Sequence, residues 1–212
     1  MADPAHHWQP EDRWHSLFPN QPTAKVRDCY QRLRNKYGEP HRAYHTFEHI
    51  EACLNHLDRH RDQLADARAV ELALWYHDVI YNPRASDNEA RSAIYAEEDL
   101  SRLGEPKAMI DRVKRLIEVT EHPSVPEDGD EALLLDIDLT ILGAPPDVYQ
   151  RYEEQVRREY RWVPGFLFRR GRRKLLASFL ETPFIYHSDS FHAEREQQAR
   201  ANLDRAINQL AG

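Results

Sequence analysis

The sequence predicts an all-α protein that folds as one irregular helical bundle. Only 7 glycines and 13 prolines interrupt the 212 residues, and almost every segment between them repeats its apolar residues with the helical period. No segment alternates apolar and polar residues as a half-buried strand does. Hydrophobic residues make up 41% of the chain and charged residues 31%, which is typical of a globular protein rather than a disordered one.

Apolar stripes and capping residues place nine helices along the chain. Asp66 is expected to cap the third helix, and Ser86 to Glu89 form a predicted capping box at the start of the fourth. Gly104 and Gly143 are expected to close the fourth and sixth helices. The predicted helices cover about 26–37, 45–57, 67–81, 86–103, 106–122, 133–141, 147–160, 166–180 and 191–210.

Length and charge limit the classes of function. We expect one domain over residues 1–212, and a formal net charge of −7 disfavours nucleic acid as a partner. No apolar run approaches the roughly 20 residues of a membrane span, and the N-terminus lacks the features of a secretory signal, so we expect a cytoplasmic protein without a membrane partner. Cys29 and Cys53 fall on apolar helix faces and are expected to be buried thiols. The oligomeric state is not predicted.

His77 and Asp78 are the most informative residues. They are adjacent, and the apolar residues Leu72 to Trp75 precede them while Val79 and Ile80 follow them, which predicts that both lie in a buried helix. A buried carboxylate needs a partner, and a metal ion accepts imidazole and carboxylate together. The alternative is a helix end that meets solvent before Pro83.

Three further segments carry metal-ligand residue types. His45 and His49 are four residues apart at the start of a predicted helix, so both imidazoles can face one site, although partly exposed histidines are common there. Asp136 and Asp138 lie in an apolar helix, and because they do not share a face, at most one is expected to face the site; an arginine partner is the alternative. His122 ends a helix, where the helix dipole alone also favours histidine.

Several polar residues have structural explanations that compete with functional ones. Glu89, with its neighbours Asp87 and Asn88, could line a pocket mouth or simply cap a helix. Glu196 and Arg200 are spaced for an ion pair within one helix. The basic cluster Arg169 to Lys174 is expected to be mostly a solvated helix face, and Arg42, three residues before His45, is a better candidate for a phosphate contact.

The order His, His-Asp, Asp resembles the HD superfamily of metal-dependent phosphohydrolases. The resemblance rests on three stretches and spans about residues 42–142, with the helices of 147–210 expected to pack on this core. The stretches are Tyr44-His45-Thr46-Phe47-Glu48-His49-Ile50, Leu72-Ala73-Leu74-Trp75-Tyr76-His77-Asp78 and Asp136-Ile137-Asp138-Leu139. The chain looks most similar to uncharacterised bacterial proteins of that superfamily.

The resemblance implies a role for each motif residue. By similarity to the Tyr-His-Asn-x-x-His stretch of cyclic-nucleotide phosphodiesterases, His49 would bind metal and His45 would be the general acid. Asp138-Leu139-Thr140 is similar to the Asp-Leu-Ser of that family, which favours Asp138 over Asp136. The implied metal ligands are therefore His49, His77, Asp78 and Asp138, and the candidates for a second metal or for substrate are His122, Asp136, Glu89 and Arg42.

The resemblance also implies the reaction. It is hydrolysis of a phosphoester, such as a nucleotide, by water that a divalent metal activates; Mn, Fe, Mg, Co, Ni and Zn are all compatible, with one ion expected and two allowed. Tyr81 stands where the phosphodiesterases have a second histidine, so a cyclic nucleotide is not implied. A non-catalytic metal- or nucleotide-binding regulatory module is the alternative. A zinc peptidase that uses His45-x-x-Glu48-His49 ranks lower, because it leaves His77, Asp78 and Asp138 unexplained.

Overall fold

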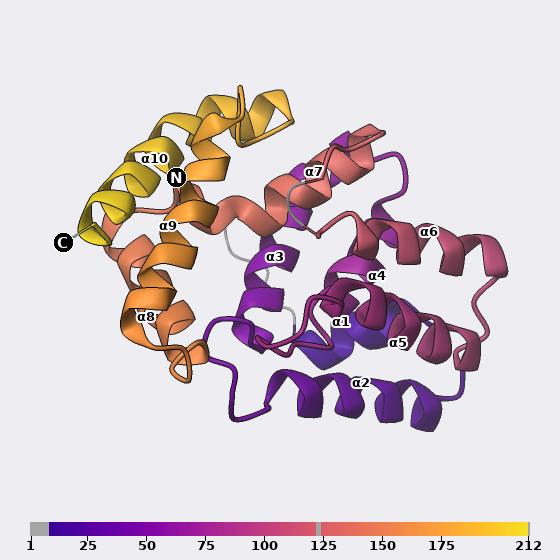
Figure 1. Ribbon diagram of the computed structural model, residues 1–212. Coiled ribbons are helices and arrows are strands. Elements are labelled where there is room, and N and C mark those ends of the chain that lie inside the picture. Colours follow the sequence, from indigo (N-terminus) through magenta and orange to yellow (C-terminus); the bar gives the residue numbers. More distant parts are fainter. Residues whose placement is uncertain (1–8, 122–123, 212) are drawn as a thin grey trace.

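The computed structural model describes residues 9–121 and 124–211, and this part of the chain is helical without any strand, which confirms the all-α prediction. Turns and loops join its helices into a single domain (Figure 1). They are α1 (Pro10–Ser16), α2 (Thr23–Tyr37), α3 (Phe47–His60), α4 (Ala67–Tyr76), α5 (Asn88–Arg102), α6 (Lys107–Glu118), α7 (Gly129–Asp138), α8 (Pro146–Glu159), α9 (Gly165–Glu181) and α10 (Asp189–Gln209), with short 3₁₀ helices η1 (Arg61–Gln63) and η2 (Leu139–Gly143).

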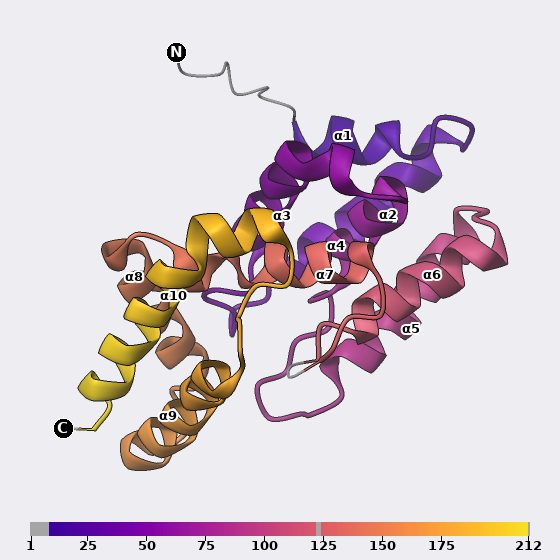
Figure 2. The same ribbon diagram turned by 90° about the horizontal axis from the view of Figure 1, so that it is seen from above.

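Helix α4 lies at the centre of the bundle, and Glu71 is the one charged residue in its buried stretch. Every residue from Ala69 to Tyr76 is buried, as expected for a helix that is covered on all sides. Helices α3, α5, α6 and α7 pack on it. In both views α8, α9 and α10 lie to one side of α3, α4 and α7, and α5 and α6 lie to the other (Figures 1 and 2). The ends of the central helices are therefore flanked by the C-terminal helices.

Helix α1 was not predicted from the sequence. It has only seven residues, and its main core residue is Trp14, so no apolar period could reveal it. Trp14 is fully buried and donates a hydrogen bond from Nε1 to the carbonyl of Val26 at 3.0 Å. The buried Arg13 pairs with Glu71 of α4 at 2.6 Å, which fixes α1 against the central helix.

The prediction that a helix continues to Tyr81 is wrong, because α4 ends at Tyr76. His77 is the C-cap, and Asp78 lies in the turn that follows. Side chains satisfy the backbone groups that a longer helix would have paired. Arg42 donates to the carbonyls of Asp78 and Val79 at 2.8 and 3.0 Å, and the amide of Ile80 donates to Ser92 Oγ at 3.0 Å.

Two other helix starts differ from the prediction, and one agrees with it. Helix α3 begins at Phe47, so His45 precedes the helix instead of lying on its face. The predicted capping box starts at Ser86, whereas α5 begins at Asn88 and its N-cap is Asp87, whose side chain makes no capping hydrogen bond. The side chain of Asn88 bonds the amide and the carbonyl of Asn82. Asp66 caps α4 as predicted, since its side chain accepts from the amide of Ala69 at 2.9 Å.

The chain after α7 ties the C-terminal helices to the core. At Gly143, a Cβ atom would stand 2.7 Å from Cβ of Arg195 and 2.9 Å from the hydroxyl of Tyr186, so only glycine allows α10 to approach this closely. Asn202 of α10 is buried and donates to the carbonyls of Leu142 and Ala144 at 2.8 Å. Across residues 9–121 and 124–211, none of the helices combines the length and the apolar character that crossing a membrane requires.

Candidate metal centre

Three elements bring His49, His77, Asp78 and Asp138 together. His49 lies in the first turn of α3, His77 and Asp78 follow the last turn of α4, and Asp138 ends α7. His49 Nε2 lies 3.2 Å from His77 Nε2 and 3.1 Å from Asp138 Oδ1, and His77 Nε2 lies 3.4 Å from the same oxygen. Asp78 Oδ2 is 3.2 Å from His77 Nε2 and 3.6 Å from His49 Nε2. Two imidazole nitrogens and two carboxylate oxygens thus converge on one point.

The orientation of His77 suits a metal ligand. Its Nδ1 lies 3.0 Å from the carbonyl of Leu74, and because a carbonyl only accepts, Nδ1 carries the proton. In the neutral ring, Nε2 then presents its lone pair to the point of convergence. A hydrogen bond from the distal ring nitrogen to a backbone carbonyl is a common way to orient a metal-binding histidine.

Burial makes the charges in this cluster interact strongly. His49 and His77 are only 7% and 2% exposed. Burial opposes the charged form of His77, but the charge of Asp78 and hydrogen bonds to Asp138 and Asp78 outweigh it and hold its pKa well above the ordinary value. Burial likewise opposes the charged form of Asp78, yet His77 and His45 hold its pKa below the ordinary value. The carboxylates therefore stabilise a positive charge beside them, which is either a proton on an imidazole or a bound cation.

The donor set fits a divalent cation. Nitrogen and oxygen ligands about 2.0 to 2.2 Å from one ion lie about 3.0 to 3.5 Å apart in octahedral or tetrahedral geometry. The separations of His49 and His77 from each other and from the two carboxylates, 3.1 to 3.6 Å, are close to that range. Ligand atoms of His49, His77 and Asp138 all lie within 4.8 Å of one another. A site with two imidazoles and carboxylates accepts several transition metals.

His45 does not join this cluster and instead pairs with Glu159 of α8. His45 Nδ1 lies 2.7 Å from Glu159 Oε2, which also accepts from the hydroxyl of Tyr81 at 2.8 Å. Glu159 Oε1 accepts the backbone amides of Ala43, Tyr44 and His45. Although burial opposes its charged form, the bonds from His45 and these amides lower the pKa of Glu159 to about 2. Glu159 is therefore a fixed anion that orients the His45 ring.

The placement of His45 also bears on the peptidase interpretation. In that interpretation both imidazoles of His45-x-x-Glu48-His49 bind one ion. The ring centroids of His45 and His49 lie 6.3 Å apart, and the Nδ1 of His45 is bonded to Glu159. Glu48 is exposed and lines a different cavity from His45, the one that His49 lines. The geometry therefore disfavours a shared ion between these two histidines.

A cavity of about 400 Å³ opens beside the cluster. His45, Asp78 and Asp138 lie in its wall, so the proposed acid and two of the candidate ligands face the same space. Its remaining wall includes Glu89 and residues from α8 and α9, among them Tyr152, Arg172 and Phe179. On its other side the cluster meets a second cavity of about 380 Å³, which His49, Cys53 and Asp138 line. The cluster is thus buried but reachable.

The candidates for a second metal or for substrate lie in different environments. Asp136 is fully buried and accepts from the amides of His187 and Ser188, both at 2.7 Å, so it ties α7 to the start of α10. Arg42 is buried, and its guanidinium bonds backbone carbonyls and Glu39. Glu89 does line the cavity. The prediction for His122 falls outside the described residues.

Three residues of the site carried no recognisable signal in the sequence. Glu159 lies 114 residues from its partner His45. Arginines close to Glu159 in the sequence are equally plausible partners for its carboxylate. Tyr81 was noted only because it replaces a histidine of the phosphodiesterases. Arg172 lies in a run of basic residues that predicts a solvated helix face, but it is buried and pairs with Glu153 at 2.7 Å. Packing between segments that are distant in sequence brings Tyr81 and Arg172 to the cavity and Glu159 to His45.

Comparison with protein-family models, with curated proteins and with solved structures found no match to this chain.

Proposed function

We propose that the protein hydrolyses a phosphoester with a divalent metal ion held by His49, His77, Asp78 and Asp138. The observation that carries the proposal is the convergence of four metal-ligand side chains at the wall of a cavity that also contains His45. The resemblance of these stretches to the HD superfamily supports the same reaction. A small phosphorylated molecule, such as a nucleotide, is the expected substrate, because the adjoining cavity of about 400 Å³ has the size of a small-molecule site.

The cation and His45 would have different roles in such a reaction. A bound divalent cation supplies two effects, a lower pKa of water and polarisation of a phosphoryl oxygen. His45 Nδ1 is engaged with Glu159, so Nε2 is the nitrogen that can protonate a leaving oxygen. Burial opposes protonation of His45, but Asp78 and Glu159 overcome this and raise its pKa. His45 is therefore predisposed to act as an acid near neutral pH.

The test is a phosphoesterase assay on chelator-treated protein after each of Mn²⁺, Fe²⁺, Co²⁺, Ni²⁺, Mg²⁺ and Zn²⁺ is restored. The substrates are p-nitrophenyl phosphate, bis-p-nitrophenyl phosphate and a panel of nucleotides. Hydrolysis is expected with at least one cation and should be lost in His77→Ala. The matched control is His192→Ala, because His192 is exposed on α10 and its loss should leave the rate unchanged.

Two results would overturn the proposal. One is the absence of hydrolysis with every cation, and tight nucleotide binding without turnover would then favour a regulatory module. The other is a His77→Ala variant that is as active as the parent protein.

A further inference from the structure

A separate cavity of about 510 Å³ lies behind Tyr81 and Glu159. These two residues form a common wall, since each also contacts His45 of the candidate metal centre. The separate cavity contains neither the metal-ligand candidates nor His45. Its wall includes four basic side chains and one tryptophan, namely Lys36, Arg84, Arg91, Arg161 and Trp162.

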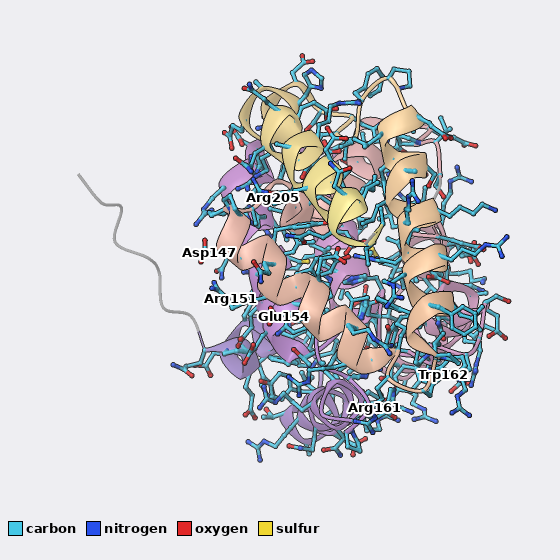
Figure 3. All side chains as sticks on the ribbon, turned by 60° about the vertical axis from the view of Figure 1, so that its left-hand side comes forward. Asp147, Arg151, Glu154, Arg161, Trp162 and Arg205 are labelled. Atoms are coloured by element: carbon cyan, nitrogen blue, oxygen red, sulfur yellow. The ribbon has the colours of Figure 1, made fainter. Side chains whose placement is uncertain are left out.

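Two of the four basic groups have no acidic partner. No carboxylate among residues 9–121 and 124–211 lies within ion-pair distance of Arg84 or Arg161. Lys36 and Arg91 have only loose contacts, 3.5 Å to Glu39 and 3.9 Å to Asp87. Arg84 instead lies over the ring of Trp162, 4.6 Å from its centroid. Figure 3 shows Arg161 and Trp162 together at the turn between α8 and α9.

The acidic groups of this wall do not cancel these charges. Glu159 is surrounded by three backbone amides, His45 and Tyr81. Glu39 lies against the guanidinium of Arg42 at 3.3 Å. Positive charge therefore gathers in one cavity of a chain whose net charge is −7, and a local field of this kind attracts an anion.

The side chains define the chemistry of the ligand. Guanidinium groups suit phosphate because their planar fork donates two hydrogen bonds at once, and lysine adds a point charge. A volume of about 510 Å³ is typical of sites for small molecules. We propose that this cavity is a second binding site, distinct from the metal centre, that takes the oligophosphate group of a small molecule. The proposal goes beyond the hydrolase and does not depend on it.

Calorimetric titration with inorganic pyrophosphate tests the site directly. The titration uses Asp138→Asn protein at physiological salt, so that a bound cation in the metal centre does not compete for the probe. One pyrophosphate per chain is expected. The double variant Arg84→Gln, Arg161→Gln should weaken binding by roughly tenfold or more, because it removes two charge-assisted hydrogen-bond donors.

The matched control removes the same charge elsewhere. Arg170→Gln with Arg173→Gln takes two exposed arginines from α9 and should change the affinity by less than roughly twofold, because only remote charge is lost. Circular dichroism confirms that each variant is folded. Absence of binding to the Asp138→Asn protein, or equal weakening in the two double variants, would overturn the proposal.

Discussion

Two clusters in this protein each hold buried or half-buried carboxylates, but different basic side chains face the carboxylates in the two clusters. Beneath α1, Glu71 is only 3% exposed in its side chain and accepts from Arg13 at 2.6 Å and from Arg61 at 2.9 Å. At the ends of α4 and α7, Asp78 and Asp138 face the imidazoles of His49 and His77. Both clusters join helices that are distant in sequence.

The difference lies in the partner. A guanidinium carries a permanent charge and has no lone pair to offer a metal, so the Glu71 cluster is complete by itself. An imidazole can lose its proton and become a ligand, so the His-Asp cluster can exchange protons for a cation. We therefore interpret the carboxylate between two arginines as structural, and the two carboxylates that face two imidazoles as the candidate metal site.

The largest expected effect comes from Asp138→Asn, which removes one charge and one ligand oxygen from the His-Asp cluster. Hydrolysis should fall on the order of 10³-fold or more, because metal-dependent chemistry is lost together with the ion. Asp136→Asn is the matched control, two residues away in the same helix. It should lose stability by about 1 to 3 kcal/mol, because Asp136 bonds the start of α10, yet keep the rate per folded molecule. Equal loss of activity in both variants would contradict the assignment of Asp138.

A substitution in the arginine cluster should lower stability and leave activity and metal content unchanged. Glu71→Gln removes the anion that Arg13 and Arg61 share, while Arg13 keeps its bonds to Asp58 at 2.7 and 2.9 Å. We expect a loss of about 1 to 3 kcal/mol of stability, the usual effect of removing a buried hydrogen-bond partner of a charged group. Denaturant unfolding measures this loss. Metal content and the rate of the surviving folded protein should not change, so a loss of metal in Glu71→Gln would erase the distinction between the two clusters.

The His45→Ala variant distinguishes metal binding from catalysis. The variant should bind metal as the parent protein does, because His45 bonds to Glu159 and not to the cluster. Its kcat should fall by about 10² to 10⁴, the usual contribution of a general acid. Measurement of metal content and of kcat on one preparation decides the matter, since an empty site in His45→Ala would make His45 a ligand.

The pH dependence of stability tests the Glu159 anchor. Its folded pKa of about 2 lies below its ordinary value of 4.5, so its stabilising effect is present above pH 4.5 and is lost as the pH falls from 4.5 towards 2. The loss is on the order of 3 kcal/mol for a shift of this size. His45, whose pKa is raised, acts at higher pH and in the opposite direction.

Unfolding free energies of the parent protein and of Glu159→Gln should therefore converge as the solution becomes more acidic. Parallel curves for the two proteins between pH 4.5 and 2 would show that Glu159 is not stabilised as a carboxylate.

Sequence reasoning succeeded where the signal was local. The apolar period of α2 and the cap at Asp66 both follow from residues within one helix. Adjacency of His77 and Asp78 was enough to single them out, but the end of α4 at Tyr76 was not foreseeable, because Arg42 and Ser92 supply the backbone partners from far along the chain. Asp136 and Asp138 have nearly the same sequence context, and only the position of α10 assigns the first to structure.

The most direct test of the account is equilibrium dialysis of chelator-treated protein against Mn²⁺, Fe²⁺ or Zn²⁺, followed by elemental analysis. The account predicts at least one tightly held ion per chain in the parent protein. It predicts none in a His49→Ala, His77→Ala double variant whose circular dichroism remains helical. A parent protein that retains no ion, or a folded double variant that retains as many ions as the parent, would contradict it.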